Sequence, residues 1–213
     1  MNPVKNLHQG KKEMKVCKVV AMLVLSVMLC SCAGQLKTTT PVQDEYAGIN
    51  RIEGASIESV QKESRVTSGY ENIVLNPIQM SPQFATDYPK MKSEFQSSLL
   101  GYLKDKHVYQ SVEDHLKDTK LKKRTMIVDT KVIDMRIVGT HARMWGGFMA
   151  GSSHADIYLK LTDATSQNVL LERVIGTSYN AFASEFAFGS EHSLPMDMGQ
   201  IIGEYICTVA PVK

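Results

Sequence analysis

The sequence predicts an α+β fold, a single domain over residues 70–213 in which helices pack on one face of one sheet. Three observations predict it. The segment "DYPKMKSEFQSSLLGYLKDK" spaces apolar residues by three and four, which is the helical period, whereas "SHADIYLKLTD" alternates apolar and polar residues as a strand does. The chain ends in a second apolar helical pattern. A sheet covered by two long helices buries the apolar surfaces of both.

The first half of this domain reads as a β-α-β unit. "YENIVLNPI" is a short apolar run that ends at Asn76-Pro77, which is typical of a strand. The helix that follows has Asp87 and Pro89 as start signals. "VYQSV", residues 108–112, is the second strand. The apolar face of the helix is expected to carry Tyr88, Met91, Phe95, Leu99 and Tyr102.

The second half predicts an antiparallel three-strand meander and a C-terminal helix. "RTMIVDTKVIDMRIVG" is rich in β-branched residues, and its apolar phase changes, so a bulge near Thr130 to Val132 or cover on both faces is expected. "SHADIYLKLTD" and "VLLERVIGTSY" are the other strands, joined by the turn "DATSQN". The last helix takes Ser193 as its cap, has Pro195 in its first turn and stops before Pro211.

The N-terminus predicts export and lipidation. Five lysines precede "VVAMLVLSVML", which gives the charged region and the short apolar region of a signal peptide over residues 1–31. The apolar run is too short for a spanning helix, which needs about 20 residues. "LCSC" resembles the lipobox of bacterial lipoproteins, with the small residue Ser31 before Cys32. The alternative is an ordinary signal peptide cut near Ala33.

The lipobox resemblance implies cleavage between Ser31 and Cys32, and diacylglycerol and an N-acyl chain on Cys32. The protein is then anchored in the bacterial cell envelope without spanning the membrane. Ala33 and Gly34 lack the aspartate that retains many lipoproteins in the inner membrane, which favours the outer membrane, facing the periplasm. Residues 32–69 are expected to be a flexible tether or arm, with one short element between residues 46 and 69 as the alternative.

Charge and cysteine content exclude several classes of partner. The chain has 24 basic and 22 acidic residues, but removal of residues 1–31 leaves 19 basic and 21 acidic, so a nucleic-acid partner is not expected. Cys207 is then the one cysteine of the domain, and its apolar neighbours indicate a buried thiol. The five remaining histidines are scattered, so neither a metal site nor a cofactor is expected.

The stretch "SSHAD" contains serine, histidine and aspartate, which are the residue types of a catalytic triad. On a strand, however, His154 and Asp156 point to one face and Ser153 to the other, so the three do not converge. We therefore expect a protein without enzyme activity.

The stretch "RMWGGFMAGSSH" is the strongest candidate for a binding site. Its glycines have the spacing of a phosphate-binding loop, but the lysine that such a loop requires is absent. Between two strands, the glycines suit a hairpin connection. Its large side chains then form either an apolar tip that binds a partner or part of the core. The candidate partner-binding residues are Arg143, Met144, Trp145 and Phe148.

The domain resembles a family of bacterial envelope lipoproteins of unknown function. The shared features are a Gly- and Arg-containing hairpin, here with Arg143, and a D-A-T-x-x-x-V-L turn, here from Asp163 to Leu170, with Ser166 where the family usually has glycine. More loosely, the layout is similar to curli-secretion and TolB-type periplasmic domains, which are assembly parts and not enzymes.

The resemblance implies a non-catalytic, membrane-anchored interaction or assembly module. Its partner would be another envelope protein or a second copy of the chain, bound through the hairpin and the aromatic loop "YNAFASEFAFG". The alternative is a periplasmic carrier or sensor of an apolar ligand, which would show an enclosed apolar cavity between sheet and helices.

Overall fold

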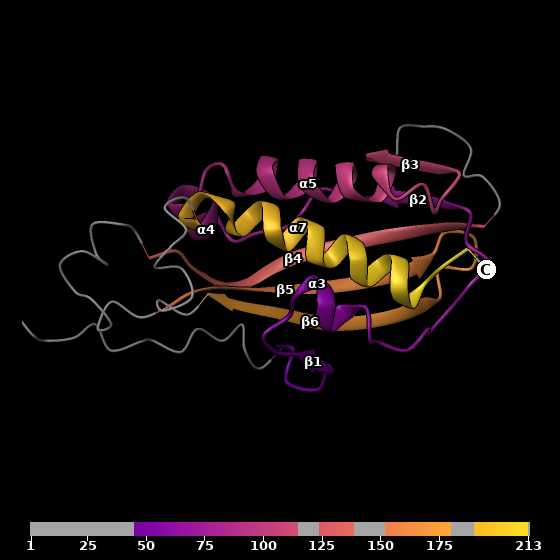
Figure 1. Cartoon of the computed structure of the whole chain (residues 1–213), viewed down its shortest axis with the longest axis horizontal. Coiled ribbons are helices and arrows are strands. Elements are labelled where there is room, and N and C mark those ends of the chain that lie inside the picture. Colours follow the sequence, from indigo (N-terminus) through magenta and orange to yellow (C-terminus); the bar gives the residue numbers. More distant parts are fainter. Residues whose placement is uncertain (1–44, 115–123, 139–151, 180–189, 213) are drawn as a thin grey trace, which may run out of the picture. The chain divides into compact units, whose positions relative to one another are not determined.

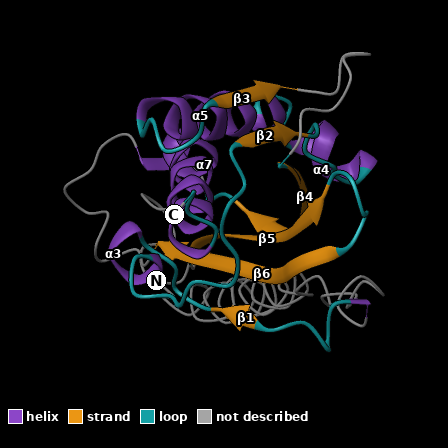
Figure 2. Cartoon of the chain, turned by 90° about the vertical axis from the view of Figure 1, so that its right-hand side faces the viewer, coloured by secondary structure: helices purple, strands orange, loops and turns teal. Residues whose placement is uncertain are grey.

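A six-stranded sheet with helices on one face forms the domain in the computed structural model, which describes residues 45–114, 124–138, 152–179 and 190–212 (Figures 1 and 2). The strands lie in the order β1-β6-β5-β4-β2-β3. Their bounds are β1 Arg51–Ile52, β2 Asn72–Leu75, β3 Ser111–Asp114, β4 Thr125–Arg136, β5 Ser153–Asp163 and β6 Val169–Tyr179. The helices are α3 Ile57–Val60, α4 Pro82–Asp87, α5 Met91–Asp105 and α7 Ser190–Val209.

The topology confirms the predicted fold class. Strands β2 and β3 are parallel neighbours joined through α4 and α5, and β2 also pairs in parallel with β4. Strands β4, β5 and β6 form the predicted antiparallel meander, and α7 follows as the C-terminal helix. Within the described residues, none of the helices is long and apolar enough to cross a bilayer.

Strand β3 begins three residues later than the predicted 108–112. The reason is Tyr109, which is buried and whose hydroxyl donates hydrogen bonds to the carbonyl oxygens of Ile206 (3.3 Å) and Ala210 (2.8 Å). Because its ring is held against the end of α7, pairing with β2 starts only at Ser111, opposite Asn72.

The change of apolar phase in β4 does mark a bulge. The register with β5 shifts between Val132 and Asp134, so Ile133 is the extra residue. The shift lies just after the predicted segment, and it allows Val132 and Met135 both to be buried in the core.

The start of α5 differs from the prediction. Asp87 ends the separate helix α4, whose first turn is capped by Ser81: its Oγ accepts the backbone N–H of Phe84 at 3.2 Å. Helix α5 begins at Met91. Its buried face is completed by Leu103 in place of Tyr102, because the Tyr102 hydroxyl turns to Glu204. The buried residues of α5 are Met91, Phe95, Leu99 and Leu103.

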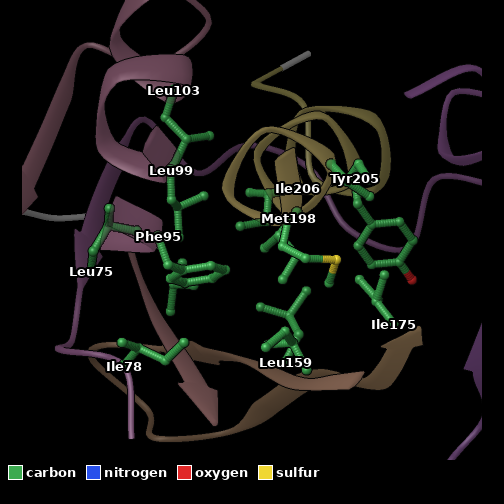
Figure 3. Packing of buried hydrophobic residues seen from close by; sticks show 14 of the residues in the cluster. Leu75, Ile78, Phe95, Leu99, Leu103, Leu159, Ile175, Met198, Tyr205 and Ile206 are labelled. Carbon is green, nitrogen blue, oxygen red and sulfur yellow. The ribbon is translucent and has the colours of Figure 1, made fainter. Parts of the chain in front are cut away.

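Helix α7 starts at Ser190, so Ser193 lies inside the helix and is not its cap. Pro195 is also inside, early enough that the chain continues helically to Val209. Figure 3 shows how α5 and α7 fill the space over the sheet: Phe95 of α5 and Met198 of α7 point toward the strands, and Met198 lies over Leu159.

The segment expected as a tether or arm is partly built into the domain. Ala55 and Val60 are buried, and α3 begins with a capping box in which Ser56 and Ser59 hydrogen-bond each other's backbone N–H. Strand β1 pairs in parallel with β6 at the edge of the sheet. The folded domain therefore begins before residue 70.

Candidate interaction site at one end of the sheet

Three strand termini lie together at one end of the sheet. Strand β4 ends at Arg136, which is opposite His154 near the start of β5, and Ser153 of β5 is opposite Tyr179, the last residue of β6. Helix α7 begins at this same end (Figure 1). The β4–β5 connection and the segment between β6 and α7 therefore both start from here.

The sequence-predicted contact residues belong to these two connections. Arg143, Met144, Trp145 and Phe148 lie outside the described residues, as do residues 180–189 of the aromatic loop. Ser31 and Cys32 lie outside them as well.

The described base of the β4–β5 connection is fixed by side chains. The hydroxyl of the buried Ser153 accepts the backbone N–H of Val138 at 3.0 Å, and the Tyr88 hydroxyl accepts that of Ile137 at 3.3 Å. Tyr88 comes from the turn between α4 and α5. The backbone that follows β4 is therefore held by β5, through Ser153, and by the turn between α4 and α5, through Tyr88.

Ser153, His154 and Asp156, which are the residue types of a catalytic triad, each contact a different partner. Ser153 is engaged with Val138, whereas the His154 ring faces Asp134, with Nε2 3.2 Å from Oδ2. Asp156 accepts a hydrogen bond from Arg51. The alternation of β5 is as predicted, because Ala155 and Ile157 are buried in the core while His154 and Asp156 lie on the outer face, away from the helices.

The outer face carries an ion-pair cluster that sequence reasoning missed. Arg51 of β1 contacts both Asp156 and Glu53. Burial raises the pKa of the Asp156 carboxyl, and the neighbouring Arg51 only partly offsets this. The one signal in the sequence is Gly176 in an otherwise branched strand. A Cβ there would lie 2.5 Å from Asp156 Oδ1, so the glycine makes room for the cluster.

A second group of contacts holds residues 45 and 46 to the same face. The Nζ of Lys131 donates to the Tyr46 hydroxyl at 2.7 Å and contacts Glu45 at 3.3 Å. The Tyr46 ring lies 4.9 Å from that of Tyr158, between centroids. Tyr158 in turn donates its hydroxyl to Glu172.

The D-A-T turn lies at the other end of β5. Asp163 Oδ1 accepts the backbone N–H groups of Ser166 (2.6 Å) and Thr165 (2.9 Å), and Oδ2 accepts the hydroxyl of Tyr70 (2.9 Å). The bond from the Ser166 backbone, followed by that from Tyr70, lowers the pKa of Asp163. The left-handed residue of the turn is Gln167 (φ 59°), so serine at position 166 carries no backbone strain.

Cys207 is the free cysteine among the described residues. Burial raises the pKa of the half-buried Cys207 to about 11, which keeps it a thiol at neutral pH. In the part of the chain that the structure describes, no three His, Cys, Asp or Glu side chains are grouped as a metal site would require. An open pocket of about 500 Å³ lies beside α4 and the start of α5, lined by Pro77, Ile78, Gln79, Met80, Ala85, Pro89 and Lys92.

Comparison with solved structures finds bacterial proteins of low sequence identity. A PelC dodecamer from Paraburkholderia phytofirmans is 9% identical, with a TM-score of 0.46 over 68% of this chain and 93% of that chain. A DUF330 protein from Xanthomonas campestris is 10% identical, with a TM-score of 0.45 over 74% and 92%. A neuraminyllactose-binding hemagglutinin homolog from Helicobacter pylori, so described, is 10% identical, with a TM-score of 0.30 over 68% and 88%.

Family membership comes from the sequence itself. The curated proteins contain no match to this chain. Residues 51–183, by contrast, match a family described as "Domain of unknown function (DUF4410)", and this match spans β1 to β6. Because it covers more than half of the sequence, the chain belongs to the DUF4410 family.

Proposed function

We propose that this protein is a non-catalytic lipoprotein of the bacterial cell envelope that acts as an interaction or assembly module. The observation that carries the proposal is the convergence of the β4, β5 and β6 termini at one end of the sheet. The Gly-rich connection and the aromatic loop therefore start from neighbouring strand ends. Two short segments rich in aromatic and glycine residues then serve one contact surface.

The side-chain composition of these two segments supports a protein partner. The first contains Trp145 and Phe148 among glycines, and the second is "YNAFASEFAFG". Aromatic residues with arginine are enriched at the centres of protein–protein contacts, and Arg143 precedes the tryptophan. The outer face is less suited to such contact, because it carries ion pairs such as those of Arg51 with Asp156 and of Lys131 with Glu45.

The carrier alternative requires an enclosed apolar cavity between sheet and helices. In the described structure that space is occupied by side chains, among them Phe95, Met198 and Leu159 (Figure 3). The pocket beside α4 is open and not an enclosed cavity. The interaction module is therefore the better-supported function.

The membrane anchor is tested at Cys32. Replacement of Cys32 by Ser removes the thiol that receives the diacylglycerol, so the protein should move from the membrane to the soluble fraction. The measurement is membrane fractionation followed by immunoblotting, with Cys30→Ser as the matched control. Retention of the Cys32→Ser protein in membranes would contradict the lipid anchor.

The contact surface is tested by crosslinking in intact cells and purification through a C-terminal tag. We expect a specific envelope protein, or the chain itself, to be recovered, and Trp145→Ala and Phe148→Ala to reduce its yield at least about tenfold, as for a central contact residue. Val169→Ala is the control, since Val169 is 49% exposed at the start of β6, the opposite end of the sheet. Equal recovery with all three variants would exclude these connections as the contact.

A further inference from the structure

Residues 76–80 form an edge of the sheet beyond the end of β3. Strand β3 pairs with β2 only as far as Asp114, opposite Leu75. The chain after β2 stays paired with β4 through Gln79, whose N–H donates to a β4 carbonyl oxygen at 2.9 Å and whose carbonyl oxygen accepts a β4 N–H at 2.8 Å. Among the described residues, no strand lies on the other side of this segment.

The backbone of this edge offers hydrogen-bonding groups on the side away from β4. Successive residues of an extended chain turn their N–H and C=O groups to opposite sides, so Ile78 and Met80 face away from β4 where Gln79 faces it. The Ile78 N–H accordingly donates to Gln96 of α5, at 3.3 Å. In the described part of the chain, the Ile78 carbonyl oxygen and the Met80 N–H have no hydrogen-bond partner. Such an edge can pair with an added extended chain.

A groove, which is the open pocket of about 500 Å³ beside α4, follows this edge. The edge residues line one side of it, and α4 and the start of α5 line the other. Most of its lining side chains are apolar, namely Pro77, Ile78, Met80, Ala85 and Pro89. In an extended chain that lay along the edge, every second side chain would face this apolar lining.

Lys92 gives the groove its charge, since it is the one charged residue among the described residues that line it. Gln96, four residues later on the same face of α5, connects the Ile78 N–H to the Asp114 carboxylate at the end of β3, the latter at 2.8 Å. Lys92 therefore lies one helical turn farther along the edge. It is exposed, and its ammonium group has no hydrogen-bond or ion-pair partner among the described residues. A carboxylate is the group that complements it.

We infer that the groove binds an extended acidic peptide segment of a partner protein. The segment lies in line with β3, pairs its backbone with Ile78 and Met80, and directs one carboxylate side chain to Lys92, with apolar side chains at the alternate positions on either side. A peptide fits better than a small acid, because only a peptide backbone can pair with the sheet edge. This site is separate from residues 139–151 and 180–189, so the inference goes beyond the contact surface proposed above.

The first test measures peptide affinity for the full chain in detergent solution by fluorescence anisotropy. The probe is a capped hexapeptide of alternating valine and serine, labelled with an uncharged coumarin, in which glutamate replaces the central valine. Its control has glutamine at that position. We expect the glutamate peptide to bind about two- to fivefold more tightly, as one exposed ion pair allows.

This preference should disappear in Lys92→Gln and persist in Lys104→Gln, which changes an exposed lysine at the other end of α5. Absence of saturable binding, equal affinity of the wild type for both peptides, or an unchanged preference in Lys92→Gln would overturn the inference.

The second test asks whether the peptide pairs with the sheet edge. Saturating glutamate peptide should slow hydrogen exchange of the Met80 N–H at least about threefold and leave α7 unchanged. A peptide N-methylated at its pairing residues should bind about tenfold more weakly, because it lacks the N–H groups of the added strand. Unchanged exchange at Met80, or equal binding of the N-methylated peptide, would refute edge pairing.

The competing occupant is a small apolar acid, for which hexanoate is the probe. Hexanoate has a carboxylate and an apolar chain but no peptide backbone, so it should displace the glutamate peptide only at concentrations at least about tenfold above the peptide's own dissociation constant. Displacement at or below that constant would assign the groove to small acids and overturn the peptide inference.

Discussion

Glu204 is the polar residue on which the packing of three helices depends. Its buried carboxylate accepts hydrogen bonds from Tyr102 of α5 (2.6 Å), from Gln61 at the end of α3 (2.7 Å) and from Lys106 at the end of α5 (2.8 Å). Burial by itself would raise the pKa of Glu204, but the three donors, Lys106 foremost, together lower it. The folded state therefore favours the charged form.

The substitution Glu204→Gln should lower the free energy of unfolding by about 1–2 kcal/mol at pH 7, since hydrogen bonds to a charged acceptor are lost. A lowered pKa stabilises the fold above the unfolded-state value of 4.5, and this contribution is lost as the pH falls through the folded-state value. The difference between wild type and variant should thus shrink below pH 4.5. Urea titrations at pH 7 and pH 4 measure it, with the exposed Asp105→Asn as control; a gap that widens in acid would contradict the assignment.

The contact between α5 and α7 depends on a glycine at the point of closest approach. A Cβ on Gly199 would lie 2.8 Å from the Phe95 carbonyl oxygen and 2.9 Å from the Leu99 backbone nitrogen. Because backbone atoms cannot yield, Gly199→Ala should destabilise the protein by about 1–3 kcal/mol. Gly101→Ala, in the same helix pair but with open space, should stabilise it by about 0.5–1 kcal/mol. Thermal unfolding measures the stability of both variants. An unchanged stability of Gly199→Ala would show that the two helices can move apart at little cost.

Elements with a strong period were predictable, and their ends were not. The alternation of β5 and the three-four spacing of α5 depend only on which side faces the core, so both were found from the sequence. The ends depend on single long-range contacts. The hydrogen bond from Tyr109 to the end of α7, for example, moves the first residue of β3 to Ser111. The pairing of Arg51 with Asp156 joins residues that are 105 positions apart, and no local sequence pattern predicts it.

The whole molecule shows which parts of the candidate site follow from the topology. The meander was predicted, and with it the placement of the Gly-rich connection between adjacent strands. That the aromatic loop starts from the same end follows from the register of β5 with β6, which a sequence pattern does not specify. The attachment of residues 45–55 was missed for the same reason, because two-residue strands have no periodicity.

The described core gives a reference against which the role of the candidate contact residues can be tested. Residues from both long helices, the sheet and α3 form one cluster of buried side chains. If Trp145 and Phe148 serve a partner, the double variant Trp145→Ala/Phe148→Ala should change the free energy of unfolding by less than about 0.5 kcal/mol while partner recovery falls. Burial of the two side chains in the core would instead cost about 3–5 kcal/mol for each. Urea unfolding of the purified domain distinguishes the two results, with Phe95→Ala as the reference for a fully buried aromatic residue; a loss near that of Phe95→Ala would place the Gly-rich connection in the core and withdraw it as the contact surface.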